Sequence, residues 1–193
     1  MAETAQAQDL VRIEGPFAIE LDETSWNRQI DRAAAWLGNV ISAQAAFREL
    51  LENTVPKIEE PNIRLYLSEM LENARRHERQ AADLFRPIGR EPASAGRGVA
   101  GTVVATARKV LGTIEGVAGG AAGNWRDIRE LQIANLDAMG AFAVAEQLGL
   151  ALAIHELRDL AFQIESEKSS DQLVLQEIML EMASVSILYK ASV

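Results

Sequence analysis

The side chains in this sequence that could bind a metal or move a proton are carboxylates, amides and two histidines, His77 and His155. The 193 residues include no cysteine, which excludes a disulfide scaffold, a thiolate zinc site, an iron–sulfur cluster and a cysteine nucleophile. Two histidines are also too few for a three-histidine zinc site. The chemistry therefore depends on where the polar residues fall relative to the apolar positions.

Polar residues interrupt the apolar seams of four segments that have a helical repeat. These residues are Gln44, Asn73, His77, Asn135, Glu167 and Asp171. Inside a helical bundle, an unpaired polar group costs about 1–3 kcal/mol, so such side chains are expected to meet and to hydrogen-bond with one another. The sequence therefore predicts one polar core layer to which all four segments contribute, with Gln44, Asn73 and Asn135 as its amides.

A layer of this kind is where a helical bundle can hold two metal ions. That site needs four carboxylates and two histidines, with Glu-x-x-His on each of two helices. No Glu-x-x-His occurs in this sequence, and Glu72 lies five residues before His77, roughly 140° around a helix. The candidate metal ligands are His77, Glu167, Glu72 and Asp171. The layer itself offers two carboxylates and one imidazole, about half of a di-metal site.

Four long segments have the apolar spacing of amphipathic helices, and residues 1–21 are predicted to be an N-terminal tail. The predicted helical ranges are about 22–55, 61–86, 125–148 and 150–189. Prolines end the first two helices, Gly149 is expected to end the third, and a kink in the fourth is expected near Ser169–Ser170. Within the tail, residues 10–21 are predicted to pair as a short extended arm.

The connections between these segments predict the architecture. Short links join the first helix to the second and the third to the fourth. The Gly/Ala-rich residues 93–124, with a helical piece over Thr102–Ile114, are long enough for the second and third helices to run parallel. The sequence therefore predicts an all-α fold, a four-helix bundle over residues 22–193 with a long crossover connection at 93–124.

Charge and hydropathy limit the partners and the compartment. Nineteen basic and 28 acidic residues give a formal net charge of −9, which disfavours binding to nucleic acid. The N-terminus lacks the basic and apolar regions of a signal peptide, and no apolar run approaches the ~20 residues that cross a bilayer. A cytoplasmic protein without a membrane span is expected.

Four short stretches occur in order along the predicted helices. They are 42–44 (SAQ), 71–74 (LENA), 145–149 (AEQLG) and 164–168 (IESEK). In this order and at this spacing, they resemble the YciF-like branch of the ferritin-like superfamily, over residues ~25–180. The resemblance implies a ferritin-like bundle, often a stress-associated or structural protein that self-associates. It also implies a metal site in those members that keep the carboxylates.

The sequence departs from this family at the acidic positions. Gln44 stands where the first helix of the family has Glu, and Asn73 stands where the second helix has the second Glu of a pair. The acidic positions of the third helix fall near Asn135, which is uncharged. His77 and Glu167 still match. The resemblance therefore implies a degenerate di-metal site.

An apolar stripe near the C-terminus predicts association. Met179, Met182, Val185 and Leu188 recur at helical spacing on a segment that a single bundle is not expected to bury. A homodimer or higher homo-oligomer is the plain prediction. A different protein partner on the C-terminal helix is the alternative.

These observations lead to three hypotheses. The first is a non-enzymatic, stress-related ferritin-like protein that acts by association and holds no cofactor. The second is an iron or manganese carboxylate protein that stores iron or reduces peroxide or oxygen through irregular ligands. The candidate ligands are then Glu49, Glu72, His77, Glu78, Glu130 and Glu167. The third is a protein that binds an apolar ligand in an elongated dry cavity between the helices.

Overall fold

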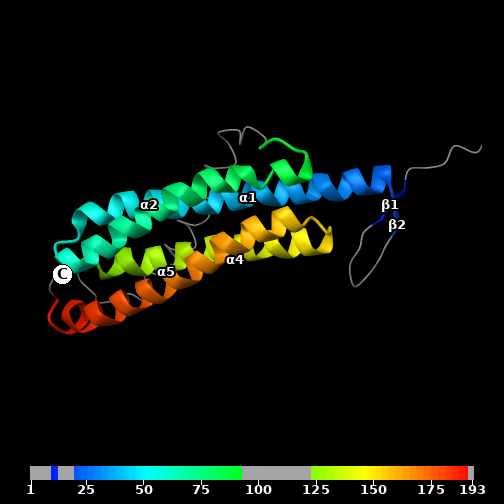
Figure 1. The fold of residues 1–193 in the computed structure, drawn as a ribbon. Coiled ribbons are helices and arrows are strands. Elements are labelled where there is room, and N and C mark those ends of the chain that lie inside the picture. Colours follow the sequence, from blue (N-terminus) through cyan, green and yellow to red (C-terminus); the bar gives the residue numbers. More distant parts are fainter. Residues whose placement is uncertain (1–9, 13–19, 93–122, 191–193) are drawn as a thin grey trace, which may run out of the picture.

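The computed structural model describes residues 10–12, 20–92 and 123–190 (Figure 1). Two short strands precede four long helices, and two 3-10 turns follow the first two helices. The elements are β1 (Leu10–Arg12), β2 (Glu20–Asp22), α1 (Glu23–Thr54), η1 (Val55–Lys57), α2 (Pro61–Asp83), η2 (Arg86–Ile88), α4 (Trp125–Ala151) and α5 (His155–Leu188). The predicted helical piece at Thr102–Ile114 and nearly all of the predicted crossover lie outside the described residues.

The four long helices form two antiparallel hairpins, α1 with α2 and α4 with α5, and α1 also packs along α4 (Figure 1). At one end of the molecule, Lys57 Nζ lies 2.8 Å from Asp127 Oδ2, so α2 and α4 begin side by side. At the other end, Arg86 Nη2 lies 2.7 Å from Glu156 Oε1. The second and third long helices therefore run in the same direction, and the predicted all-α class is confirmed for the described residues.

The first two helices begin at side-chain caps that the sequence places there. The carboxylate of Asp22 accepts a hydrogen bond from the Ser25 backbone N–H at 2.9 Å, and Glu60 accepts one from Ile63 at 2.6 Å. Each cap satisfies a backbone donor that has no partner within the helix. Just before α1, β1 pairs antiparallel with β2, which confirms the predicted extended arm.

The link between α4 and α5 differs from the prediction. Helix α4 passes through Gly149 and ends at Ala151, and α5 begins only at His155. A Cβ atom added to Gly149 would lie 2.5 Å from the backbone nitrogen of Arg158. Gly149 is therefore needed for the close approach of α4 and α5, and the prediction that it ends the helix was wrong. Helix α5 runs without interruption through Ser169–Ser170.

The core lies along the axis between the four helices. Its largest fully buried apolar side chains include Phe47, Phe142, Leu37 and Leu131. Two tryptophans join helices at its border, since Trp36 Nε1 donates to Ala141 O at 3.2 Å and Trp125 Nε1 donates to Met179 O at 2.9 Å. None of the helices in the described ranges carries an apolar stretch long enough to cross a bilayer.

Candidate functional site

A polar layer crosses the middle of the bundle, with one fully buried residue from each long helix. These residues are Gln44 on α1, His77 on α2, Asn135 on α4 and Lys168 on α5. The structure thus places Gln44, His77 and Asn135 inside the core, while Asn73 is half-buried at its border. Lys168 was not among the polar residues expected in the layer.

Lys168 is enclosed by an aromatic ring and an amide. Its Nζ atom lies 4.2 Å from the centre of the Phe47 ring and donates to Asn135 Oδ1 at 3.3 Å. The amide nitrogen of Asn135 donates to the backbone oxygen of Lys168 and to Gln172 Oε1, each at 3.0 Å. Burial lowers the pKa of Lys168 to about 7, although the charge of Asp171 acts in the opposite direction.

Next to this lysine, a buried histidine meets a half-buried carboxylate. His77 Nε2 lies 2.9 Å from Glu167 Oε2, and Arg76 pairs with the same carboxylate oxygen. Burial lowers the pKa of His77, and the hydrogen bond to Glu167 offsets this only in part. The imidazole is therefore neutral at pH 7 and donates its Nε2–H to Glu167.

Glu167 carries the negative charge of this pair. Its burial raises its pKa, but the hydrogen bond from His77 and the positive charge of Arg76 more than compensate. The pKa of Glu167 consequently lies below its ordinary value, and this carboxylate is ionised at neutral pH.

Two buried polar atoms of the layer have no hydrogen-bond partner among the described residues. They are Gln44 Oε1 and His77 Nδ1. The other end of the Gln44 amide is satisfied, because Nε2 donates to the backbone oxygen of Ala74 at 2.9 Å. An unsatisfied buried acceptor typically costs about 1–3 kcal/mol. These two unpaired atoms therefore reduce the contribution of the layer to the stability of the fold.

The four predicted metal ligands do not converge. His77 and Glu167 are in contact, but Glu72 is exposed on the outer side of α2, where it pairs with Arg75 at 2.6 Å. Asp171 is half-buried, and burial raises its pKa to about 6, with the charge of Lys168 opposing this rise. Over 20–92 and 123–190, no three His, Asp or Glu side chains group closely enough to hold a metal ion.

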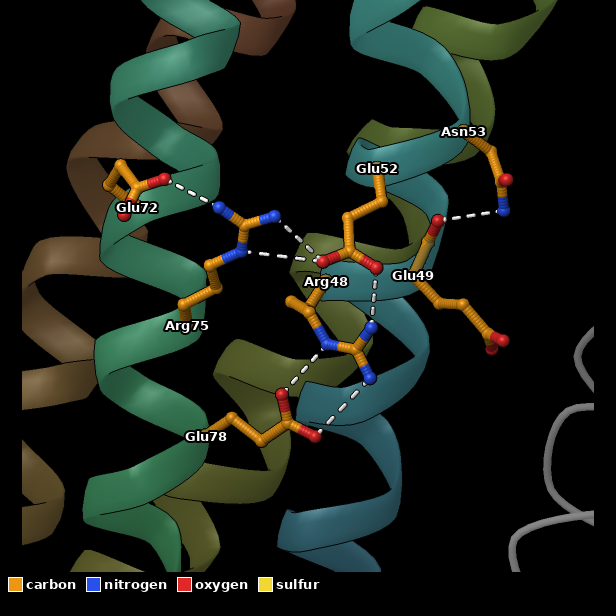
Figure 2. Close-up of polar contacts among 7 residues, drawn as sticks. All are labelled: Arg48, Glu49, Glu52, Asn53, Glu72, Arg75 and Glu78. Carbon is orange, nitrogen blue, oxygen red and sulfur yellow. Dashed lines mark hydrogen bonds and ion pairs between the residues drawn. The ribbon is translucent and has the colours of Figure 1, made fainter.

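Two of the irregular ligands proposed from the sequence, Glu72 and Glu78, belong to an ion-pair network on the outside of α1 and α2 (Figure 2). Arg48 pairs with Glu78 at 2.8 Å and with Glu52 at 2.6 Å, and Arg75 pairs with Glu52 at 3.0 Å. Glu49 is exposed and directed away from this network (Figure 2). Glu78 and Glu72 are thus each held by an arginine and lie outside the central layer.

The exposed apolar surface of α5 is not the predicted stripe. Met182 is buried and Met179 is half-buried against the core, while Leu188 is 73% exposed. The predicted stripe therefore spans an inner and an outer face of the helix. The large apolar side chains that do face outward lie on a different line along α5.

An apolar hollow of about 620 Å³ lies between α1 and α4 and opens to the surface. Its lining includes Trp36, Ile133, Leu136 and Val144. The hypothesis of an apolar ligand expected an interior cavity between the helices, and this hollow is instead a groove on the outside of the bundle.

Comparison of the chain with protein-family models, with curated proteins and with solved structures gives no match. The function is therefore inferred from the geometry of the central layer.

Proposed function

We propose that this chain is a non-enzymatic, ferritin-like four-helix protein that acts by association, with a lysine in place of the metal ions of its central layer. The observation that carries this proposal is Lys168. Its amine is buried at the centre of the bundle, between Asn135 and the ring of Phe47.

The positions of the layer residues support a metal-site origin. In di-metal carboxylate bundles, two helices each supply a Glu and the other two each supply Glu-x-x-His. Here α1 and α4 supply Gln44 and Asn135, while α2 and α5 supply Ala74-x-x-His77 and Lys168-x-x-Asp171. On α2 and α5 these buried positions lie one residue after Asn73 and Glu167, where the family resemblance put the glutamates. All four buried glutamate positions have an uncharged side chain or an amine.

The charge of the layer argues against tight binding of iron or manganese. Such hard cations need several carboxylates that neutralise their charge. Lys168 supplies no negative charge in either protonation state and repels a cation when it is protonated. The carboxylate of Glu167 is already occupied by Arg76 and His77. An ammonium–amide–aromatic layer can instead join the four helices without any cofactor.

The direct test is metal content per chain. The protein is purified without tags or chelators, desalted, and measured by elemental analysis before and after addition of ferrous iron or manganese. The expected content is below about 0.1 equivalents in each case, because the layer lacks the carboxylates that these ions require. Near two equivalents retained through desalting would overturn the proposal in favour of the iron or manganese carboxylate protein.

A Lys168→Gln variant provides the matched control. It removes the positive charge but restores no carboxylate, so its metal content is also expected to stay near zero. Uptake of metal by this variant alone would mean that enough ligands are present and that only Lys168 excludes the ion.

A further inference from the structure

An apolar groove on the outside of the bundle lies between α1 and α4 and follows roughly 28 Å of α4. It joins the hollow of about 620 Å³ to a second hollow of about 300 Å³, because Trp36 and Val144 line both. Small residues form much of its lining, namely Ala33, Ala43, Gly140 and Ala141. Between them, Leu136 is 51% exposed and Val144 is 39% exposed. Large apolar side chains are therefore open to water along this groove.

Residues 93–122, which lie outside the described residues, connect the two ends of α1. Before them, Arg90 Nε lies 2.9 Å from Asp31 Oδ1, near the start of α1. After them, Asn124 Nδ2 donates to the backbone oxygen of Lys57, just beyond the end of α1, at 2.9 Å. The connection therefore has to cover roughly 39 Å in the direction of α1.

The sequence predicts a helix within this connection, over Thr102–Ile114, and the helix has one apolar stripe. The stripe covers roughly 60° around the helix and consists of Val103, Ala107, Val110 and Ile114. Arg108 and Lys109 fall on the opposite side. A helix this short is marginal in water, so it needs an apolar surface on which to bury the stripe. Its length, roughly 20 Å, fits within the groove.

We propose that the helix predicted at 102–114 docks its apolar stripe in the groove between α1 and α4 of the same chain. The other residues of the connection, about 17, can extend over roughly 55 Å, so the connection reaches both ends of α1 with length to spare. Because it enters beside the start of α1 and leaves at the start of α4, the docked helix runs parallel to α1 and antiparallel to α4.

Two other surfaces along the bundle fit an apolar stripe less well. The ion-pair network of Figure 2 crosses the outer side of α1 and α2. A hollow of about 350 Å³ between α2 and α5 is lined by three carboxylates, those of Glu60, Glu177 and Glu181. An apolar helix on either surface would take charges out of water without pairing them. The groove between α1 and α4 has apolar walls, and Asp137 on its lining offers a carboxylate to Arg108 or Lys109.

Gly140 provides a second observation that points to an occupant. It is exposed in the middle of α4, and a Cβ atom added to it would meet nothing within 4 Å. Glycine inside a helix lowers its stability relative to alanine, so packing within the described bundle gives no reason for this residue. A helix seated in the groove gives one, because glycine lets two backbones approach closely.

A filled groove limits how this protein can associate. With its own residues in the groove, the chain has to bind a partner through another face of the bundle. An empty groove would instead present Trp36, Leu136 and Val144 to a partner or to an apolar ligand. The inference does not depend on the metal content of the central layer, since a metal-free and a metal-loaded layer are both compatible with a filled groove.

Limited trypsin digestion of the full chain tests the docking, because Arg108 and Lys109 are cleavage sites within the predicted helix. Gly140→Leu puts a bulky side chain into the groove and a better helix former into α4. It should displace the docked helix and speed cleavage at these two sites by at least about tenfold. The control is Gly38→Leu on α1, outside the groove, where an added Cβ atom also meets nothing within 4 Å. It should leave the cleavage rate unchanged.

Cleavage at Arg64 and Arg129, within α2 and α4, reports opening of the bundle itself and should be the same in all three proteins. Equal cleavage rates of the wild type and Gly140→Leu within 102–114 would overturn the inference. An equal acceleration by both substitutions would overturn it as well, because the effect would then not come from the groove.

Crosslinking identifies the occupant of the groove, since the chain has no native cysteine. Ala107→Cys and Leu136→Cys in one chain should react with a short bis-maleimide to give an intramolecular crosslink. The control pair is Ala107→Cys with Leu65→Cys on α2, at a side chain that is 57% exposed against 51% for Leu136. It should not crosslink.

Two results of this experiment would reject the docking within one chain. Crosslinks that form only between chains would assign the groove to the same segment of a second copy. Crosslinking of Ala107→Cys with Leu136→Cys at no more than the level of the control pair would leave the groove open to another partner or to an apolar ligand.

Discussion

The central layer and the ion-pair network of Figure 2 both join helices through charged side chains, but they satisfy those charges differently. In the network, Arg48 pairs with Glu52 and Glu78, and Arg75 pairs with Glu52 and Glu72. These pairs lie at the edge of the bundle, where water also reaches them. In the layer, the side chain of Lys168 is fully buried. Its amine donates one hydrogen bond and lies over one aromatic ring.

The two regions therefore contribute to stability with opposite signs. Partly exposed ion pairs contribute little, because water screens them and because long side chains lose entropy when they are ordered. A buried amine loses its hydration, and apolar residues of similar volume often give a more stable core than buried charges do. Stability alone does not explain Lys168. The proposed origin of the layer in a metal site would explain why polar residues from all four helices meet at this level.

The largest expected effect comes from returning carboxylates to the layer. The triple variant Gln44→Glu, Asn135→Glu and Lys168→Glu would bury three carboxyl groups near Glu167 and Asp171. Without metal, we expect a loss of at least about 4 kcal/mol in the free energy of unfolding, because the charges repel one another and are desolvated. With excess manganese, we expect the melting temperature to recover, since an ion that binds only the folded state stabilises it.

The measurement is thermal unfolding with and without manganese, together with metal content. The control variant, Asn135→Gln with Lys168→Gln, removes the lysine without adding charge and should show no response to the metal. If the melting temperature of the triple variant also did not respond to manganese, the three substituted positions would not be ligand positions, and the comparison with di-metal bundles would fail.

A smaller effect is expected from Lys168→Met, and its size should depend on pH. Burial lowers the pKa of Lys168 from 10.5 to about 7. The stabilisation that the neutral amine provides is fully present above pH 10.5 and is lost as the pH falls through about 7. The wild type should therefore become less stable from pH 9 to pH 6, and the methionine variant should lose less over the same interval.

Urea unfolding at pH 6, 7.5 and 9 measures this difference. We expect Lys168→Met to be more stable than the wild type by about 1–3 kcal/mol at pH 6, and within about 1 kcal/mol of it at pH 9. Asp171 also titrates in this range. Burial raises its pKa from 3.8 to about 6, so its own contribution is lost as the pH rises through about 6. A difference between variant and wild type that does not change with pH would contradict the burial argument.

The helices were predictable from local signals, and the central lysine was not. Prolines and the apolar repeat placed both ends of α1 and the start of α2 to within a residue or two. On α5, the predicted layer residues Glu167 and Asp171 fall on a line through Leu160 and Ile164. The structure instead buries Ala161, Ile164 and Lys168. Because Leu160 and Ala161 are both apolar, the repeat fits either line, and a slip of one residue turns the seam by 100°. Because of this slip, the prediction missed Lys168 and placed Met182 on the exposed face of the helix.

Gly149 shows a second limit of local reasoning. A glycine near the end of an apolar repeat is typical of a helix terminus. Here the position requires glycine because the backbone of Arg158 on the next helix leaves no room for a Cβ atom. Only the packing of α4 against α5 contains that information. The amides Gln44 and Asn135 were visible in the sequence because their neighbours one turn away are unambiguously apolar.

The smallest expected effect comes from the ion-pair network, which serves as the reference for the effects in the central layer. Arg48 joins α1 to α2 through Glu78, and the two side chains are 24% and 32% exposed. A double-mutant cycle with Arg48→Met and Glu78→Gln should give a coupling energy of about 0.5–1 kcal/mol at low salt. This coupling should shrink at about 1 M NaCl, where the screening length is near 3 Å.

The pH response separates the two regions further. Arg48 stays charged from pH 6 to 9, because its hydrogen bond to Glu78 raises a pKa that is already high. The effect of Arg48→Met on unfolding should therefore be constant over the interval in which the effect of Lys168→Met changes. If Arg48→Met instead cost as much as the changes in the layer, or varied as steeply with pH, the network would be as desolvated as the core. The energetic contrast that supports the proposed metal-site origin of the layer would then be lost.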